Sequence, residues 1–153
     1  MELGPWLKLV HIAAAMAWLG GGLTLAVIGV RARRSGDATL LVAFGRTVQY
    51  VGLRVLGPAM GILLLAGISL VLVEAHSFTE PWILLALGGF ALAFVVGGVL
   101  VARSGIELRH AVDEASPDAT RLRFLAGRWV TGYSAVLAIL LFVLWDMVFK
   151  PGR

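Results

Sequence analysis

The segment from Pro5 to Val30 limits the fold more than any other part of the chain. It reads PWLKLVHIAAAMAWLGGGLTLAVIGV and carries two ionisable side chains, Lys8 and His11. The hydrocarbon core of a bilayer is about 30 Å thick and needs roughly 20 apolar residues in a helix to cross it. An ionisable group inside such a stretch is costly and is therefore a candidate functional residue. The segment predicts a membrane-spanning helix with a candidate site near its start.

Three further apolar blocks of similar length follow the first. Only 14% of the residues are Asp, Glu, Lys or Arg, whereas soluble domains average about 25%. Lipid offers the backbone no hydrogen-bond partners, so such blocks must be helical, and the alternation typical of a β-barrel is missing. The fold class predicted for residues 1–153 is all-α, a single four-helix transmembrane bundle. The expected spans are about 6–30, 55–74, 82–102 and 129–149.

The placement of the basic residues predicts the orientation of the chain in the membrane. The first and third connections between spans are rich in arginine, whereas the second, 74–81, contains no Lys or Arg. Connections rich in Lys and Arg stay in the cytoplasm. We therefore expect two Arg-rich cytoplasmic connections and both termini outside. The arginines are Arg31, Arg33, Arg34, Arg46 and Arg54 in the first connection, and Arg103, Arg109, Arg121, Arg123 and Arg128 in the third.

The overall charge and the absence of cysteine exclude several functions. A net charge of +4 is compatible with nucleic-acid binding, but the arginines lie where membrane topology requires them, so we expect a lipid bilayer and no nucleic acid as partner. Without cysteine, thiolate metal sites and thiol catalysis are excluded. The start of the chain carries Glu2 and no basic residue before the first block, unlike a signal peptide. We expect the block to be retained in a multi-pass protein of the bacterial inner membrane.

His11 is the first candidate site residue. It follows Pro5 by six residues, which places it roughly 9 Å along the helix. An imidazole in a dry bundle can bind a metal ion or haem iron, or carry protons. It can also be a neutral structural residue whose N–H is bonded to a carbonyl. Trp18 shares its helix face and is expected to pack inside the bundle.

A second candidate site lies at the outer ends of the helices. Lys8, Glu74, His76 and Asp146 are all expected there, beside His11. They could form an ion pair between Lys8 and Asp146 or collect a divalent cation, with His11, His76 and Asp146 as the candidate metal ligands. The alternative is that these charged groups at helix ends simply face water.

Small residues recur at spacings of four along three of the predicted spans. Such spacing lets membrane helices approach closely. We expect close packing within the bundle along these stripes, although contacts between subunits in a homo-oligomer would use the same feature. The stripes are Ala13, Ala17 and Gly21; Gly57 and Gly61; and Gly89, Ala93 and Gly97.

The motif Trp6-Leu7-Lys8-Leu9-Val10-His11, followed by Trp18-Leu19-Gly20-Gly21, carries a resemblance. It is similar to small four-span bacterial membrane proteins of an uncharacterised family, domain of unknown function 2269. That family resembles the membrane domain of copper-resistance protein D and, more distantly, the J-type protoporphyrinogen oxidase. By this resemblance, His11 is the residue that would bind haem or a metal ion. A second axial ligand would have to come from His76, a methionine or another subunit.

These observations predict a small integral membrane protein of unknown activity that binds haem or a metal ion through His11, and they favour a non-enzymatic role. Two alternatives remain open. One is a haem-dependent membrane oxidoreductase resembling protoporphyrinogen oxidase. The other is a carrier for a small solute or an ion that uses the outer polar residues.

Overall fold

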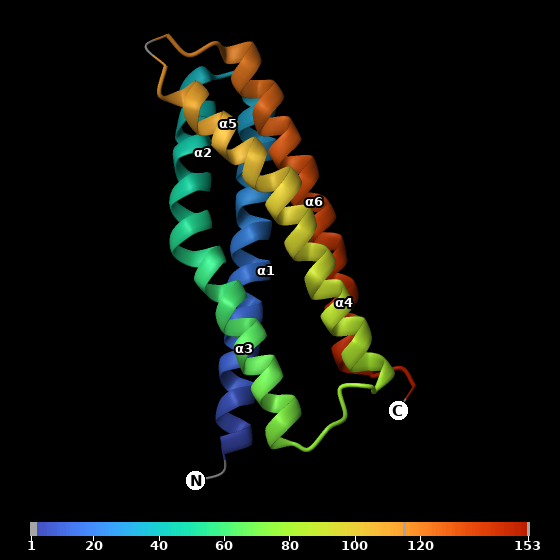
Figure 1. The fold of residues 1–153 in the computed structure, drawn as a ribbon. Helices are drawn as coiled ribbons and strands as arrows, with labels where there is room; N and C mark the ends of the chain where they lie inside the picture. The colour runs from blue at the N-terminus through green and yellow to red at the C-terminus, as the bar shows by residue number, and fades with distance from the viewer. Residues whose placement is uncertain (1–2, 115, 153) are drawn as a thin grey trace.

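The computed structural model describes residues 3–114 and 116–152, and within them it contains helices and no strands (Figure 1). Four long helical rods run antiparallel to their neighbours in sequence. Two are single helices, and two consist of α-helices joined end to end by a short π-helical segment. In chain order, the elements are α1 (Leu3–Ser35), α2 (Ala38–Val51), η1 (Gly52–Leu56), α3 (Gly57–Val73), α4 (Pro81–Val96), η2 (Gly97–Val101), α5 (Ala102–Val112) and α6 (Ala119–Phe149).

All four rods are long and apolar enough to cross a membrane, which confirms the predicted all-α, four-span architecture. They are longer than the apolar blocks, since the shortest has 31 residues and the longest 36. A helix of 31 residues is about 46 Å long, well beyond the roughly 30 Å hydrocarbon core. The excess lies mainly at the end that carries the arginines. The segment from Ala38 to Val51 thus extends the second rod at the end that carries the arginines.

Capping side chains define where two of the rods begin. Asp37 accepts a hydrogen bond of 2.8 Å from the backbone N–H of Thr39, and Asp118 accepts one of 2.9 Å from that of Thr120. Each carboxylate satisfies an N–H group that has no partner inside the helix. The third rod begins differently, with Pro81 in its first turn, where the missing N–H costs nothing.

The bundle is closed at the end that carries the arginine-rich connections, here called the arginine end. There α1, α2, α5 and α6 surround a core whose side chains are almost completely excluded from solvent. Phe44 of α2 meets Trp129 of α6 edge to face, with 5.5 Å between the ring centroids. Leu41, Leu108 and Leu122 are each 0% exposed. This tight core holds the rods together.

At the opposite end, which carries the 74–80 connection and is here called the loop end, the helices pack in two pairs. There α3 packs on α1 and α4 packs on α6, but no Cα atom of α3 lies within 8 Å of one of α4. In Figure 1, the second and third rods diverge beyond η1 and η2. Such π-helical segments are common sites of helix bending. The start of α1 and the end of α6 also lie at this end.

The small residues explain part of the packing, but two of the three predicted stripes are misplaced. On α1, Ala13 and Ala17 are exposed, and the buried stripe lies one residue later at Ala14, Trp18 and Gly22. On α3, a Cβ at Gly61 would meet nothing within 4 Å, so that stripe faces outward. Bulky Trp18 takes the interior position, where its ring meets Phe90 of α4.

The stripe on α4 packs as expected. Ala93 is 1% exposed, and a Cβ at Gly89 would overlap Val143 of α6. Gly22 provides the tightest approach on α1, because a Cβ there would overlap the ring and hydroxyl of Tyr133. These glycines allow α6 to lie against both α1 and α4.

Candidate functional site

His11 lies on the buried stripe of α1 and reaches across to α3. Its Nδ1 lies 3.0 Å from the backbone carbonyl oxygen of Leu63. Gly67, one turn further along α3, makes room for the ring, because a Cβ at that position would lie 3.0 Å from Cε1 of His11. The imidazole is therefore fixed by a small residue and a carbonyl on the neighbouring helix.

The partner of Nδ1 decides which nitrogen of His11 carries the proton. A carbonyl oxygen only accepts hydrogen bonds, so Nδ1 must be the donor, and in a neutral ring Nε2 is then unprotonated. Within the described residues, the structure gives Nε2 no hydrogen-bond partner. Nε2 therefore has a lone pair that is free to bind a ligand.

Trp18 packs inside the bundle as expected. Its side chain is 5% exposed and meets Phe90 of α4 edge to face, with 5.7 Å between ring centroids. The hydroxyl of Tyr133 donates a hydrogen bond of 3.4 Å to the backbone carbonyl of Trp18. These aromatic contacts connect α1 to α4 and α6. They fill the interior about two helical turns further along α1 than His11.

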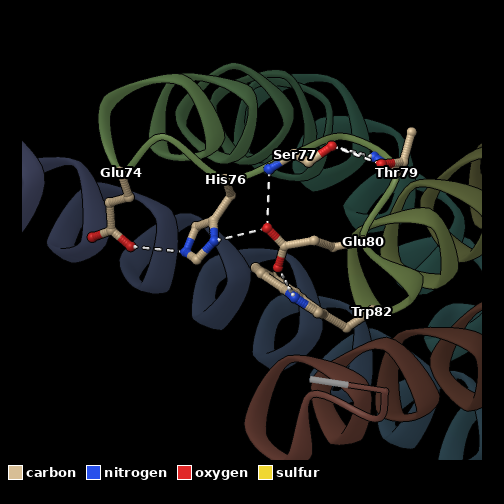
Figure 2. Close-up of polar contacts among 6 residues, drawn as sticks. All are labelled: Glu74, His76, Ser77, Thr79, Glu80 and Trp82. Carbon is tan, nitrogen blue, oxygen red and sulfur yellow. Dashed lines mark hydrogen bonds and ion pairs between the residues drawn. The ribbon is translucent and has the colours of Figure 1, made fainter.

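A chain of polar contacts crosses the loop end, as Figure 2 shows for its central part. Lys8 of α1 pairs with Oε1 of Glu74, and Oε2 of Glu74 lies 3.6 Å from Nε2 of His76. On its other side, Nδ1 of His76 lies 3.1 Å from Oε1 of Glu80. Trp82 then donates its indole N–H to Oε2 of Glu80 at 2.7 Å. The chain connects α1, the 74–80 connection and the start of α4.

Hydrogen bonds set the charge state of the two glutamates in this chain. The Lys8 ammonium holds the pKa of Glu74 below its ordinary value. The pKa of Glu80 is also lowered, first by the Trp82 indole N–H and then by the backbone N–H of Ser77. Both carboxylates are therefore ionised at neutral pH, and each faces one side of the His76 ring.

Asp146 stands apart from this chain. The pairing of Lys8 with Asp146 considered from the sequence does not form, because Lys8 pairs with Glu74. Asp146 is 0% exposed, and neither carboxylate oxygen has a hydrogen-bond partner. Lys150, one turn later, places its ammonium 4.6 Å from the centre of the Trp82 ring instead. In the described part of the chain, no three His, Cys, Asp or Glu side chains are arranged to hold a metal ion.

Some of these features left little trace in the sequence. Glu80 was identifiable, since it follows His76 by four residues and precedes the Pro-Trp pair that opens α4. The Leu63 carbonyl and Gly67 were not, because a backbone acceptor and one glycine among 19 carry no separate signal. The position of Lys150 over Trp82 depends on the left-handed conformation of Lys150, with φ of 44°, which the sequence does not indicate.

The comparisons with known proteins agree with this architecture. Residues 5–151 match the model of a family described as predicted integral membrane protein (DUF2269). The chain belongs to the DUF2269 family. No curated protein and no solved structure matches it. This DUF2269 protein is thus an integral membrane protein of unknown function, and its chemistry has to be argued from His11 and the loop end.

Proposed function

We propose that this DUF2269 protein binds haem through Nε2 of His11. The observation that carries the proposal is the hydrogen bond between Nδ1 of His11 and the Leu63 carbonyl. A ligating histidine typically donates its other N–H to a carbonyl or a carboxylate, which fixes the tautomer and orients the ring. A structural histidine could make the same bond, and the two roles differ in whether Nε2 carries a ligand.

Haem suits this position better than a bare metal ion. A bare ion needs several protein ligands, and no group of three candidate ligands exists among the described residues. Haem brings four nitrogen ligands of its own, so a single histidine can hold it. We propose that the group approaches His11 from the lipid between α3 and α4, which pack on α1 and α6 and not on each other.

The residues around His11 would control how the group is held. Leu63 would fix the imidazole, Gly67 would leave room for it, and Trp18 would limit how deep the group could enter. Bound haem would supply redox chemistry, with a potential set by its axial ligand and surroundings. We propose a binding or electron-carrying role, and oxidation of an added porphyrinogen would identify the enzymatic alternative instead.

The orientation and location are part of the same proposal. The arginines gather at the end opposite to the start of α1 and the end of α6, which supports a cytoplasmic arginine end and an outer loop end. We place the protein in the bacterial inner membrane on this basis. His11 then lies in the outer half of the membrane.

The test is an optical and metal analysis of protein purified in detergent from haem-supplemented cells. We expect a visible haem spectrum and iron in the wild type, and the loss of both in His11→Ala. His110→Ala is the matched control, because His110 is exposed at the arginine end and should not affect binding. A colourless, iron-free wild type, or a spectrum that survives in His11→Ala, would refute the proposal.

A further inference from the structure

Asp146 is the one acidic side chain of the described residues that is completely buried. It lies in the last turn of α6, is 0% exposed, and leaves both oxygens without a hydrogen bond. A buried polar group without a partner costs free energy, and an ionised one costs far more. A carboxyl group held in this way therefore points to a ligand that satisfies it.

Two contacts between α6 and the start of α4 locate this carboxyl group. Val143 packs against Gly89, and Lys150 lies over Trp82. Asp146 lies between these two residues of α6 in the sequence, about one helical turn from each. Among the described residues, Lys150 is the cation nearest to Asp146 in the sequence, and its ammonium lies against the Trp82 ring.

The other ionisable groups that the structure describes at the loop end have different partners. On α1, Lys8 pairs with Glu74 and His11 bonds to α3. In the 74–80 connection, Glu74 and Glu80 flank His76. On α6 itself, Lys150 lies against the Trp82 ring. None of these groups forms an ion pair with Asp146.

We infer that Asp146 is a reversible proton-binding site opening to the loop end of the bundle. The ligand is a proton because one carboxyl group suffices to bind it, whereas a metal ion needs several oxygen ligands, and the described residues provide no such group. The proton neutralises the carboxylate while Lys150 stays on Trp82. When Lys150 leaves the ring, its ammonium is one turn from Asp146 and can stabilise the carboxylate, so the proton is released. This inference is independent of haem binding at His11.

Labelling with dicyclohexylcarbodiimide tests the site in the full-length protein reconstituted into liposomes. This reagent adds to protonated carboxyl groups in apolar surroundings, and mass spectrometry locates the modified residue. We expect modification at Asp146 that decreases about tenfold for each pH unit above the midpoint of its titration. Asp113 and Asp118 are exposed and serve as internal controls that stay unmodified. Asp146→Asn should abolish the labelling.

Two further measurements make the outcome decisive. Sodium ions at high concentration should leave the labelling unchanged, and protection by sodium would overturn the assignment of the proton as ligand. Infrared difference spectroscopy of the wild type between high and low pH should show a protonated carboxyl band that is missing in Asp146→Asn. The absence of both that band and the labelling would overturn the inference, as would labelling that does not change with pH.

Discussion

Substituting Gly22 tests the packing of α1 against α6, which supports both candidate sites. Gly22 is buried, and a Cβ there would overlap the ring and hydroxyl of Tyr133. Tyr133 is itself 4% exposed and donates to the Trp18 carbonyl, so its ring has little freedom to move aside. Gly22→Ala should therefore push the two helices apart or break this hydrogen bond.

The size of the effect follows from three contributions. Overpacking of a well-packed interior costs about 1–3 kcal/mol, and loss of the Tyr133 hydrogen bond costs about 1 kcal/mol. The higher helix propensity of alanine offsets up to about 1 kcal/mol. We expect Gly22→Ala to lower the free energy of unfolding by about 1–3 kcal/mol, or roughly 5-fold to 150-fold in the unfolding equilibrium constant.

Unfolding in mixed detergent micelles, followed by circular dichroism, measures this change. Gly61→Ala is the matched control, because a Cβ at Gly61 meets no atom within 4 Å, and it should leave the stability unchanged or slightly increased. Equal stability of the two variants would show that α1 and α6 do not meet at Gly22 and Tyr133, and the packing described above would be wrong.

Three other perturbations have defined outcomes. Gly67→Ala should displace the His11 ring, because the new Cβ would lie 3.0 Å from Cε1 of His11. The variant should bind haem more weakly in an absorbance titration. Binding as tight as in the wild type would contradict the proposed haem site. The pKa of Glu74 is lowered from 4.5 by Lys8. The ion pair between them therefore stabilises the fold above about pH 4.5. This stabilisation is lost as the pH falls through the lower pKa that Glu74 has in the folded protein. Lys8→Met should flatten that acid decline in melting temperature, and an unchanged pH profile would argue against the pair. Asp118→Ala removes the cap of α6 and should cost about 1 kcal/mol in the same unfolding assay. Unchanged stability would show that this cap does not stabilise α6.

The sequence predicted the four spans because lipid imposes a simple rule on backbone hydrogen bonds. An apolar block of about 20 residues has one economical conformation in a membrane. The helical extensions at the arginine end were less visible, since α2 and α5 mix polar and apolar residues like soluble helices. The π-helical segments at Gly52–Leu56 and Gly97–Val101 depend on how the rods pack, and no local pattern marks them.

The candidate residues show the same limit. The positions of Lys8, Glu74 and Asp146 along their predicted spans placed them at one end of the bundle. These positions could not show which helices are neighbours there. Because α3 packs on α1, Glu74 at the end of α3 meets Lys8. Asp146 has no hydrogen-bond partner among the described residues, and Lys150, the cation one turn later, lies over Trp82. The predicted stripe of small residues on α1 was displaced by one residue from the buried one, because a large side chain, Trp18, occupies the interior.

The proposed orientation decides on which side of the membrane the loop end, with both proposed sites, lies. Labelling of single cysteines in intact cells with a membrane-impermeant maleimide measures this directly, and the chain has no cysteine of its own. Thr79→Cys in the 74–80 connection should react in intact cells, whereas Ser116→Cys at the arginine end should react only after the membrane is permeabilised. The reverse pattern would place the arginine end outside and would contradict the proposed orientation, and with it the placement of His11 and Asp146 in the outer half of the membrane.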